Sequence, residues 1–534
     1  MSVVLTAIML ASTARHGHIL FRDFVTVPDP VINEAALGMD GYLPRAVPLD
    51  LVTALIAGLV PPAVQQRVLL LVALLGAGMG FALLVRSWPW APPVAAAAAI
   101  WNPFVVERLL LGQAPTMLAY TTIPWLVLAF RAKGGLGRRT LVLTCAALPA
   151  ALTPWGSVAT LITVTALIAH SRRLATGLPL LAGPALLTMP WLLPALSNGV
   201  GSADADGAVA FAPQADAPGG VLTSIMTLGG IWAQGAHLAS RLSGGPLIAS
   251  VALILLAGYG AVRASAGRGE VRLALAGWSV PTVVVLVLAT TWGQGVAAQL
   301  QAVPGVALIR DSHRLLGWSA GAVAVLTALG ASAAVTGLRS RLRVRAAGPA
   351  MAVVAVSLCA LTAPDAGARL REAYRPTDIP REWSQAVAAV PSDGRVLVLP
   401  WQALRAPTWA DGRPFVDPLP LAVDARTVRS TTLTVERGGS LITVDDGEPA
   451  AASRWRSGLL EPHDLDAHDV EAVFIWKDSP GEWPRQVRGF ELVHDGPAFA
   501  VWTRDDAGRS GAGDAPPSGE ARAQVTGRLL STLE

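Results

Sequence analysis

The residues best suited to carry out chemistry lie near the amino terminus, between Arg15 and Pro30. Arginine pairs well with phosphate oxygens, and a carboxylate can accept a proton from an attacking hydroxyl group. This combination favours a site that handles a phosphate group, in which His18 and Arg22 bind the substrate. The simpler alternative is a polar loop held by mutual ion pairs. The ionisable residues of the segment are Arg15, His16, His18, Arg22, Asp23 and Asp29.

A second group of polar residues, Glu107, Arg108 and Gln113, lies in an otherwise apolar stretch. Ionisable residues in apolar surroundings are costly unless they are paired or face an aqueous cavity. One interpretation makes the three residues a second wall of the site, where their side chains bind a substrate. The alternative is an ion pair of Glu107 with Arg108 or with Arg67.

A third group is the run Arg310-Asp-Ser-His-Arg314, which directly precedes an apolar segment. Asp311 or Ser312 can cap the helix that begins there. Cationic side chains at the start of a helix also form an anion site. We therefore expect Arg310, His313 and Arg314 to bind a phosphate.

Familiar catalytic and metal-binding patterns are absent from the sequence. It has no Walker loop, no Rossmann glycine pattern, no HExxH and no GxSxG. His16 and His18 are the only histidines at ligand spacing, and we expect them to form hydrogen bonds rather than to bind zinc. Cys145 and Cys359 lie in apolar segments and are expected to be packing residues. We predict no metal site and assign no cofactor, and leave a divalent cation open.

The composition places these residues in a membrane protein. Of the 534 residues, 52% are hydrophobic and only 15% are charged, whereas soluble proteins have about 25% charged residues. Residues 1–363 hold 11 acidic and 22 basic side chains, and residues 364–534 hold 26 and 19. We therefore expect a membrane domain over 1–363, followed by a soluble domain. The basic residues of the membrane domain cluster at helix ends, so no nucleic-acid partner is expected.

A membrane-spanning helix needs about 20 apolar residues, and the first part contains about 11 segments of this kind, which predicts a mainly α protein. With a cytoplasmic amino terminus, the basic clusters at 131–139, 172–173, 263–272 and 339–345 all lie inside, as the positive-inside rule requires. Ten of the 11 acidic residues then lie outside. The first segment is short, so a cleaved signal peptide is an alternative for it. The expected spans are 1–14, 68–86, 91–106, 115–130, 140–154, 156–170, 177–196, 246–263, 273–290, 317–337 and 347–363.

The soluble part is expected to be a small α/β domain over residues 364–505. Apolar runs at 395–400 and 472–476 indicate buried strands, and a hairpin is expected over 490–503 around Asp495-Gly496. Residues 506–534 are rich in Gly, Ser, Ala and Pro, which predicts a disordered tail. An odd number of spans places this domain outside the cytoplasm.

Three segments, together with an acidic residue at the outer end of the first helix, resemble a known superfamily. The segments are Gly41-Tyr-Leu-Pro-Arg-Ala-Val-Pro48, Pro61-Pro-Ala-Val-Gln-Gln-Arg67 and Trp101-Asn-Pro-Phe-Val-Val-Glu-Arg-Leu-Leu-Leu-Gly-Gln113. They look like the multi-spanning GT-C glycosyltransferases, in particular actinobacterial arabinofuranosyltransferases and mannosyltransferases of cell-envelope assembly. The resemblance covers roughly residues 15–130, and the later helices are similar only in pattern.

The resemblance implies an inverting glycosyltransferase in the plasma membrane. Its donor would be a polyprenyl-phosphate sugar, and its acceptor a cell-envelope glycan or glycolipid on the outer face. The general base would fall on Asp23, the acidic residue nearest the first helix, with Asp29 as the rival. The donor phosphate would lie near Arg22, Arg310 and Arg314.

The alternative function is a non-catalytic membrane protein, either a lipid or polysaccharide transporter or an assembly scaffold. Transporters tend to place ionisable residues at the membrane midplane and to contain paired repeats. Here the ionisable residues lie at the outer edge and no repeat is found, which favours the enzyme. A third option is a family member that binds polyprenyl lipids without turnover, because Asp23 and Asp29 are six positions apart rather than close together.

Overall fold

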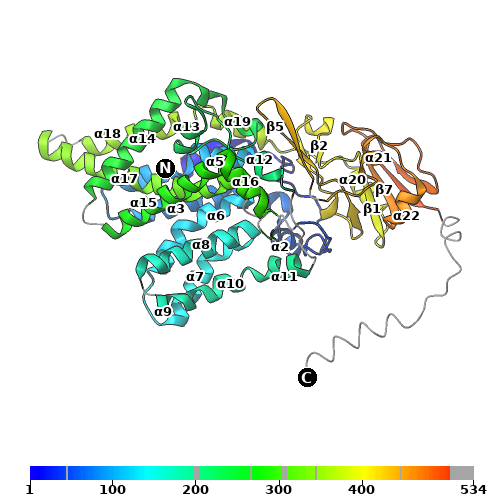
Figure 1. Ribbon diagram of the computed structural model, residues 1–534, viewed down its shortest axis with the longest axis horizontal. Coiled ribbons are helices and arrows are strands. Elements are labelled where there is room, and N and C mark those ends of the chain that lie inside the picture. The colour runs from blue at the N-terminus through cyan, green and yellow to red at the C-terminus, as the bar shows by residue number, and fades with distance from the viewer. Residues whose placement is uncertain are drawn as a thin grey trace.

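Helices build the first two thirds of the chain, and a small sheet region builds the last third (Figure 1). The protein is described by a computed structural model that covers residues 1–43, 46–172, 174–197, 204–264, 268–301, 303, 305, 310–342, 346–445 and 447–505. The tail expected to be disordered, 506–534, lies outside the described residues.

Long apolar helices confirm a helical part able to cross a membrane. In the described residues, four helices are long and apolar enough to do so, and up to six if each of two bent pairs is one span. The bent pairs are Leu174–Leu186 with Met189–Ser197, at 67°, and Ala347–Leu361 with Ala366–Ala373, at 54°. The four helices are α3 (Pro62–Leu84), α14 (Gly244–Arg263), α15 (Arg268–Leu288) and α17 (Leu316–Leu342).

One face of α14 shows what these helices present to their surroundings. Ile248, Leu255 and Val262 are 70%, 69% and 79% exposed. Residues seven positions apart lie on one side of a helix, so the three form an apolar stripe. A continuous apolar surface of this kind is typical of contact with lipid or with another protein.

The other expected spans are short or interrupted helices. The first contains only α1 (Ser2–Met9) and a following 3-10 turn. The expected span 91–106 is divided into α4 (Ala91–Ile100) and α5 (Pro103–Leu110). Asn102 caps α5 by accepting the Val105 N–H (3.0 Å), and the proline that follows Asn102 disfavours a helical conformation at that residue. The remaining three are α6 (Ala114–Phe130), α7 (Leu136–Ala151) and α8 (Pro154–Ser171).

Short helices form most of the remaining structure of this part. Among them, α2 lies in the segment 15–67, and α12 and α13 lie in the segment 197–245. The charge pattern predicts that both segments face outside, and we call them the first and second outer loops. The bounds of the short helices are α2 Leu49–Ile56, α9 Leu174–Gly177, α10 Ala182–Leu186, α11 Met189–Ser197, α12 Gly207–Ala210, α13 Gly220–Met226, α16 Thr291–Leu300, α18 Ala347–Leu361 and α19 Ala366–Ala373.

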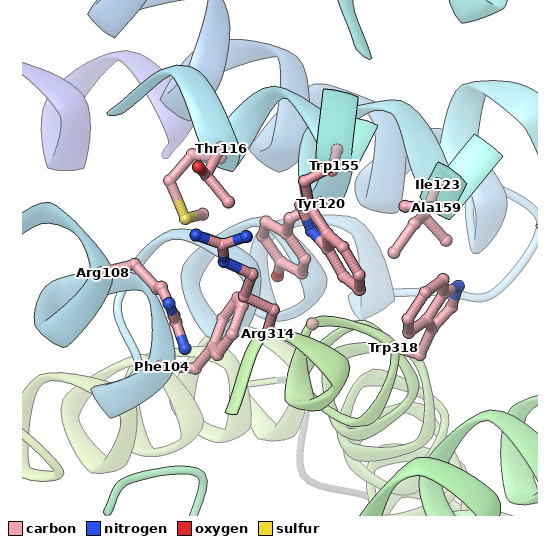
Figure 2. Close-up of a pocket in the computed structure, with 12 residues that line it drawn as sticks. Phe104, Arg108, Thr116, Tyr120, Ile123, Trp155, Ala159, Arg314 and Trp318 are labelled. Atoms are coloured by element: carbon pink, nitrogen blue, oxygen red, sulfur yellow. The ribbon is translucent and has the colours of Figure 1, made fainter. Parts of the chain in front are cut away.

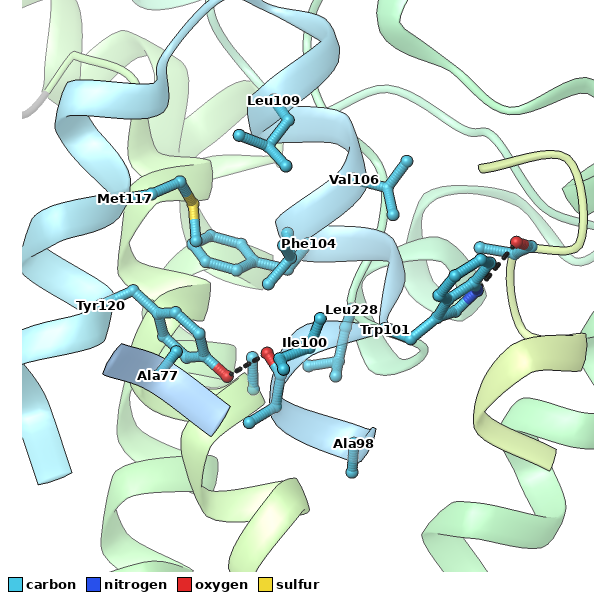
Figure 3. Packing of buried hydrophobic residues seen from close by; sticks show 14 of the residues in the cluster. Ala77, Ala98, Ile100, Trp101, Phe104, Val106, Leu109, Met117, Tyr120 and Leu228 are labelled. Atoms are coloured by element: carbon cyan, nitrogen blue, oxygen red, sulfur yellow. Dashed lines mark hydrogen bonds between the residues drawn. The ribbon is translucent and has the colours of Figure 1, made fainter. Parts of the chain in front are cut away.

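The core beneath α5 is dense and aromatic (Figure 3). Phe104 contacts Tyr120 edge to face, with ring centroids 5.7 Å apart. The Tyr120 hydroxyl donates to the Ala99 carbonyl (2.9 Å), and the Trp101 indole donates to the Ala363 carbonyl (3.0 Å). All eight residues of α5 are buried, so this helix is a rigid support for the side chains that it carries.

The last third contains the expected α/β domain. Its main sheet has the strand order β4-β1-β7-β9-β8. β1 is parallel to β4 and β7, and β9 is antiparallel to β7 and β8. The expected strands at 395–400 and 472–476 and the expected hairpin are therefore confirmed. The strands are β1 Arg395–Leu399, β4 Arg426–Val428, β7 Val470–Trp476, β8 Phe490–Asp495 and β9 Phe499–Arg504.

Smaller elements surround this sheet. Two two-stranded ribbons pair β2 with β3 and β5 with β6. A short helix, α20, precedes β1. The bounds are β2 Leu404–Arg405, β3 Phe415–Val416, β5 Leu433–Arg437, β6 Ser440–Val444, α20 Trp383–Ala388, α21 Ala452–Arg456 and α22 Pro462–Ala467.

The first outer loop is part of the carboxyl-terminal domain rather than a neighbour of it. Leu20 and Val27 lie in the same buried cluster as Val396 and Phe415. Asn33 donates from its amide to the carbonyls of Pro420 (2.8 Å) and Val423 (2.6 Å). In Figure 1 the dark blue loop lies directly against the yellow part of this domain. The loop that carries the candidate catalytic residues is thus fixed by residues almost 400 positions away.

Candidate functional site

The backbone around Asp23 is held from both sides. Arg22 has a positive φ of 50°, a conformation that is unfavourable for residues with a side chain. The Arg22 N–H donates to the Pro414 carbonyl (2.7 Å), and the Arg22 carbonyl accepts from the Val416 N–H (2.8 Å). The β3 ribbon therefore fixes the turn from which the exposed Asp23 side chain projects.

Gly112 lies against the same turn, and its replacement gives a first prediction. A Cβ atom here would lie 2.5 Å from the Phe21 carbonyl oxygen and 2.7 Å from the Asp23 nitrogen, at a φ of +74°. We expect Gly112→Ala to displace the turn, to lower activity, and to cost more than the roughly 1–3 kcal/mol of an unfavourable φ alone. Thermal unfolding of the solubilised protein measures the stability change.

The matched control for this prediction is Gly220→Ala. Gly220 has a similar φ of +78°, but a Cβ atom at this position would meet no other atom within 4 Å. The Gly220→Ala variant therefore has a similar backbone strain but no steric clash of the added Cβ atom. Equal losses of stability and activity in the two variants would show that close packing of Gly112 against the Asp23 turn contributes neither to stability nor to activity.

Gln113 connects Asp23 to a buried arginine. Its Nε2 donates to Asp23 Oδ2 (3.4 Å), and its Oε1 accepts from Arg108 Nη1 (2.8 Å). Arg108 has no exposed surface and binds Asp311 through both terminal nitrogens, with Nη2 2.7 Å from Oδ1. The same Nη2 lies 2.8 Å from His313 Nδ1. Residues from the first outer loop, α5 and the segment before α17 thus form one network.

Glu107 extends this network toward the second outer loop. Its Oε2 lies 3.5 Å from His313 Nε2 and accepts the Ile231 N–H (3.1 Å). Its Oε1 lies 3.7 Å from Arg241 Nε. Arg241 in turn binds both carboxylate oxygens of Asp216, at 2.6 and 3.2 Å. At most 2% of any of these four ionisable residues is exposed.

The two carboxyl groups of this region, both outside the candidate spans, have pKa values shifted in opposite directions. Burial raises the pKa of Glu107 well above its usual value, and the nearby Asp216 raises it further. Burial also acts to raise the pKa of Asp216, but attraction to Arg241 outweighs it and holds that pKa well below its usual range. Asp216 is therefore the charged partner of Arg241, and Glu107 is the carboxyl group of this pair that holds a proton more readily.

Arg314 leads from the network into a pocket (Figure 2). Its Nε lies 3.4 Å from Asp311 Oδ2, and its guanidinium lies 5.8 Å from the centre of the Trp155 ring. Asp23 is close enough to act on Arg314 electrostatically. Figure 2 shows the two arginines at one end and Trp318 at the other. The pocket is narrow, with a cavity volume of about 10 Å³, which is roughly what one water molecule needs. Its lining beyond the arginines includes Phe104, Met117, Tyr120, Ile123, Trp155, Ala159 and Trp318.

The other two expected phosphate ligands flank this region. The Arg22 guanidinium lies 5.7 Å from the Phe21 ring centre, and burial lowers the pKa of Arg22 while the adjacent Asp23 raises it. The Arg310 guanidinium lies over the Phe211 ring, 4.6 Å from its centre. Both arginines remain candidates for binding a phosphate.

His18 and Asp29 have other neighbours. The His18 backbone exchanges two hydrogen bonds with Thr377, at 2.9 and 2.8 Å. Burial and the nearby Arg67 lower the pKa of His18, and Asp378 and the exposed Asp29 act in the opposite direction. The structure does not join this pair to the network that contains Asp23.

The ion pairs expected for Glu107 as an alternative to substrate binding are not the ones found. Arg67 donates instead to the backbone carbonyls of Thr13 (2.7 Å) and Gly17 (3.0 Å). Glu107 contacts Arg241 and His313, as described above. The expected capping by Asp311 is also absent, because its carboxylate is occupied by Arg108 and makes no capping hydrogen bond.

Three residues of the network were not predicted as site residues. Asp216 and Asp311 lie in segments that the charge pattern places on the outer face, where acidic residues are few, and that scarcity was the available signal. Arg241 gave a weaker signal, as a single basic residue between clusters that mark the opposite face. Their pairing depends on loop geometry that spacing does not reveal.

Within the described residues, one group of side chains has the geometry to hold a metal ion: Glu461, His463 and Asp464. Asp464 is already bound by Arg454, which makes it a poor ligand, and this group lies far along the chain from Asp23. Comparison with known proteins finds no matching family model and no matching curated protein.

Proposed function

We propose that this protein is a membrane glycosyltransferase that moves a sugar from a polyprenyl-phosphate donor to a glycan or glycolipid of the cell envelope. The observation that carries the proposal is the position of Asp23. An exposed carboxylate lies within electrostatic reach of Arg314, and Arg314 lies at one end of an aromatic pocket between α5, α6, α8 and α17. A base, a cation and a set of apolar side chains therefore lie together, and this combination suits a donor with a charged head and an isoprenoid chain.

In the proposed reaction, the Asp23 carboxylate accepts the proton of an acceptor hydroxyl. The hydroxyl oxygen forms a bond to the anomeric carbon while the bond from that carbon to the lipid phosphate breaks, which inverts the configuration. The phosphate leaves with the electron pair, and Arg314 stabilises its charge, with Arg22 and Arg310 nearby. Arg108 is buried and bound to Asp311, so its proposed role is to position Gln113 and Arg314.

We also propose the finer membrane arrangement, with about 11 crossings in the plasma membrane and the α/β domain outside. α6, α7 and α8 have 17, 16 and 18 residues, or about 24–27 Å at 1.5 Å per residue. This approaches the roughly 30 Å of hydrocarbon in a bilayer. The three helices contact one another, and the connection from α6 to α7 carries the basic cluster 131–139, which supports a cytoplasmic position.

The pocket gives a prediction for donor binding. Ala159 is only 4% exposed and lines the pocket from α8. We expect Ala159→Trp to block the pocket and to weaken binding of a polyprenyl-phosphate sugar by at least about tenfold, since this close-packed site cannot hold both the indole ring and a ligand chain. Ile162→Trp is the control, because Ile162 lies on the same helix and is 45% exposed. If both variants bind the donor as the wild type does and melt at the same temperature, the pocket is not the donor site.

The function itself is tested with purified protein in nanodiscs. The donors are radiolabelled decaprenyl-phosphoryl arabinose and, separately, decaprenyl-phosphoryl mannose, each with a cell-wall glycan acceptor. Transfer of label to the acceptor supports the proposal and identifies the sugar. Movement of the donor across the bilayer without a new glycosidic bond would establish a transporter instead, and binding without transfer would establish a non-catalytic lipid binder.

A further inference from the structure

A polar groove lies in the carboxyl-terminal domain, away from the pocket that contains Arg314. It runs between the Ile32–Glu34 segment of the first outer loop and the amino-terminal ends of β1, β4 and β7. Its volume is about 520 Å³, and it is open to solvent. Because the first outer loop also carries Asp23, the groove borders the same loop as the proposed catalytic base.

The wall that the outer loop contributes is rigid. Asn33 is bound to the Pro420 and Val423 carbonyls, as described above, and its own Oδ1 accepts the Ala36 N–H (2.9 Å). Glu34 binds Arg426 with both carboxylate oxygens, one of them 2.7 Å from Nη2. A wall of this kind is formed before a ligand arrives, and pre-formed sites lose less conformational entropy on binding.

The facing wall offers polar groups that no other part of the described structure uses. Arg395 begins β1 and is paired in register with Arg426 of β4 and Val470 of β7. In the described ranges, the side chains of Arg395, Asp424 and Asp469 have neither a hydrogen bond nor an ion pair. Two acceptor groups and one donor group therefore line the groove without protein partners in this part of the chain.

The chemistry of the lining selects among ligand classes. Three carboxylates and two guanidinium groups line the groove, so the net charge is close to neutral and slightly negative, which disfavours a polyanion. Aromatic side chains are absent from the lining residues, and Ile32 and Ala425 are its only larger apolar contributions, which disfavours a lipid. A neutral chain rich in hydroxyl groups matches alternating donors and acceptors.

We propose that this groove binds the acceptor glycan, in which paired hydroxyl groups donate to Asp424 and Asp469 and accept from Arg395. The inference rests on the proposed function, because it assigns the glycosyl acceptor of that reaction to this surface. The shared loop then connects the bound chain to Asp23.

The test measures glycan binding directly, without a donor. Full-length protein in nanodiscs is titrated with fluorescently labelled linear arabino-oligosaccharides and manno-oligosaccharides, for wild type, Asp424→Ala/Asp469→Ala and Arg395→Ala. We expect wild type to bind one of these chains, and each groove variant to bind it at least about tenfold more weakly, since hydrogen bonds to charged groups are lost. The controls are Asp393→Ala and Arg488→Ala, at exposed positions that do not line the groove, and they should bind as wild type does.

The proposal is overturned if wild type binds neither chain, or if the groove variants bind as tightly as wild type. It is also overturned if Ca²⁺ binds saturably, is lost in Asp424→Ala/Asp469→Ala, and no glycan binds. Transfer assays separate this inference from the function. If the groove variants transfer sugar with an unchanged acceptor KM, the proposal for the groove is wrong and the proposed enzyme stands. If glycan binding depends on the groove but no donor gives transfer, the proposed enzyme is wrong and the glycan site stands.

Discussion

Asp23→Asn is expected to reduce sugar transfer by at least about 100-fold, because an amide cannot accept the proton of the attacking hydroxyl. The Asp23 side chain is exposed, and its only hydrogen bond to another described side chain is the 3.4 Å contact with Gln113. An asparagine of the same shape can keep a contact with that amide. The variant should therefore fold normally and retain donor binding, so that the loss appears in kcat rather than in the melting temperature.

Asp29→Asn is the matched control, since it makes the same chemical change in the same loop. Asp29 is exposed and interacts with His18, away from Gln113 and Arg314. We expect this variant to transfer sugar at close to the wild-type rate. An active Asp23→Asn enzyme together with an inactive Asp29→Asn enzyme would reverse the two assignments, and two active variants would remove both residues from the chemistry.

Local patterns were enough to predict the sheet region and the presence of a helical membrane part. β1 and β7 contain short runs of consecutive apolar residues, at 396–399 and 472–476, as expected for strands covered on both faces. The β8–β9 hairpin follows from two apolar runs separated by Asp495-Gly496. These signals are contained in a few neighbouring residues, so no tertiary information was needed to interpret them.

The number of spans was harder to predict, because hydropathy does not show where an apolar stretch breaks. Residues 91–106 are apolar except for Asn102, and Asn102 ends one helix and caps the next. The break turns α5 into a buried support rather than the end of a span, and it brings Arg108 to Asp311. The pair Asn-Pro was the local signal for this interruption.

The dependence of the first outer loop on the carboxyl-terminal domain left no trace in the sequence. Leu20 stands between Ile19 and Phe21, and Val27 closely follows Phe24 and Val25, but nothing in this short apolar pattern indicates which part of the chain would cover it. Only the structure shows that they enter the core around Val396 and Phe415. The same is true of the backbone hydrogen bonds from Arg22 to β3, since any residue type can make them.

Arg241→Met is expected to be the most destabilising single change in the buried network. Arg241 is 2% exposed and binds both oxygens of Asp216, with the Thr227 hydroxyl 3.0 Å from its Nη2. Removing one partner of a buried ion pair leaves an uncompensated charge, which costs about 3–5 kcal/mol. The yield of folded protein and the melting temperature measure the loss. The double variant Arg241→Met/Asp216→Asn removes both charges, so it should regain part of the lost stability. This account would be contradicted if the double variant lost more stability than the two single variants lose when their losses are added.

Glu107→Gln is the contrasting change in the same network. Because burial and Asp216 raise the pKa of Glu107, the folded protein keeps a proton there that the unfolded chain loses above about pH 4.3. The folded state then binds more protons than the unfolded state, so the stability of the wild type falls as the pH rises toward the folded pKa. Glutamine mimics the protonated side chain and has no proton to lose. We expect Glu107→Gln to melt close to the wild-type temperature at pH 5 and at a higher temperature than wild type at pH 8. A large loss of stability at both pH values would show that Glu107 is ionised, and that Arg241 neutralises two carboxylates rather than one.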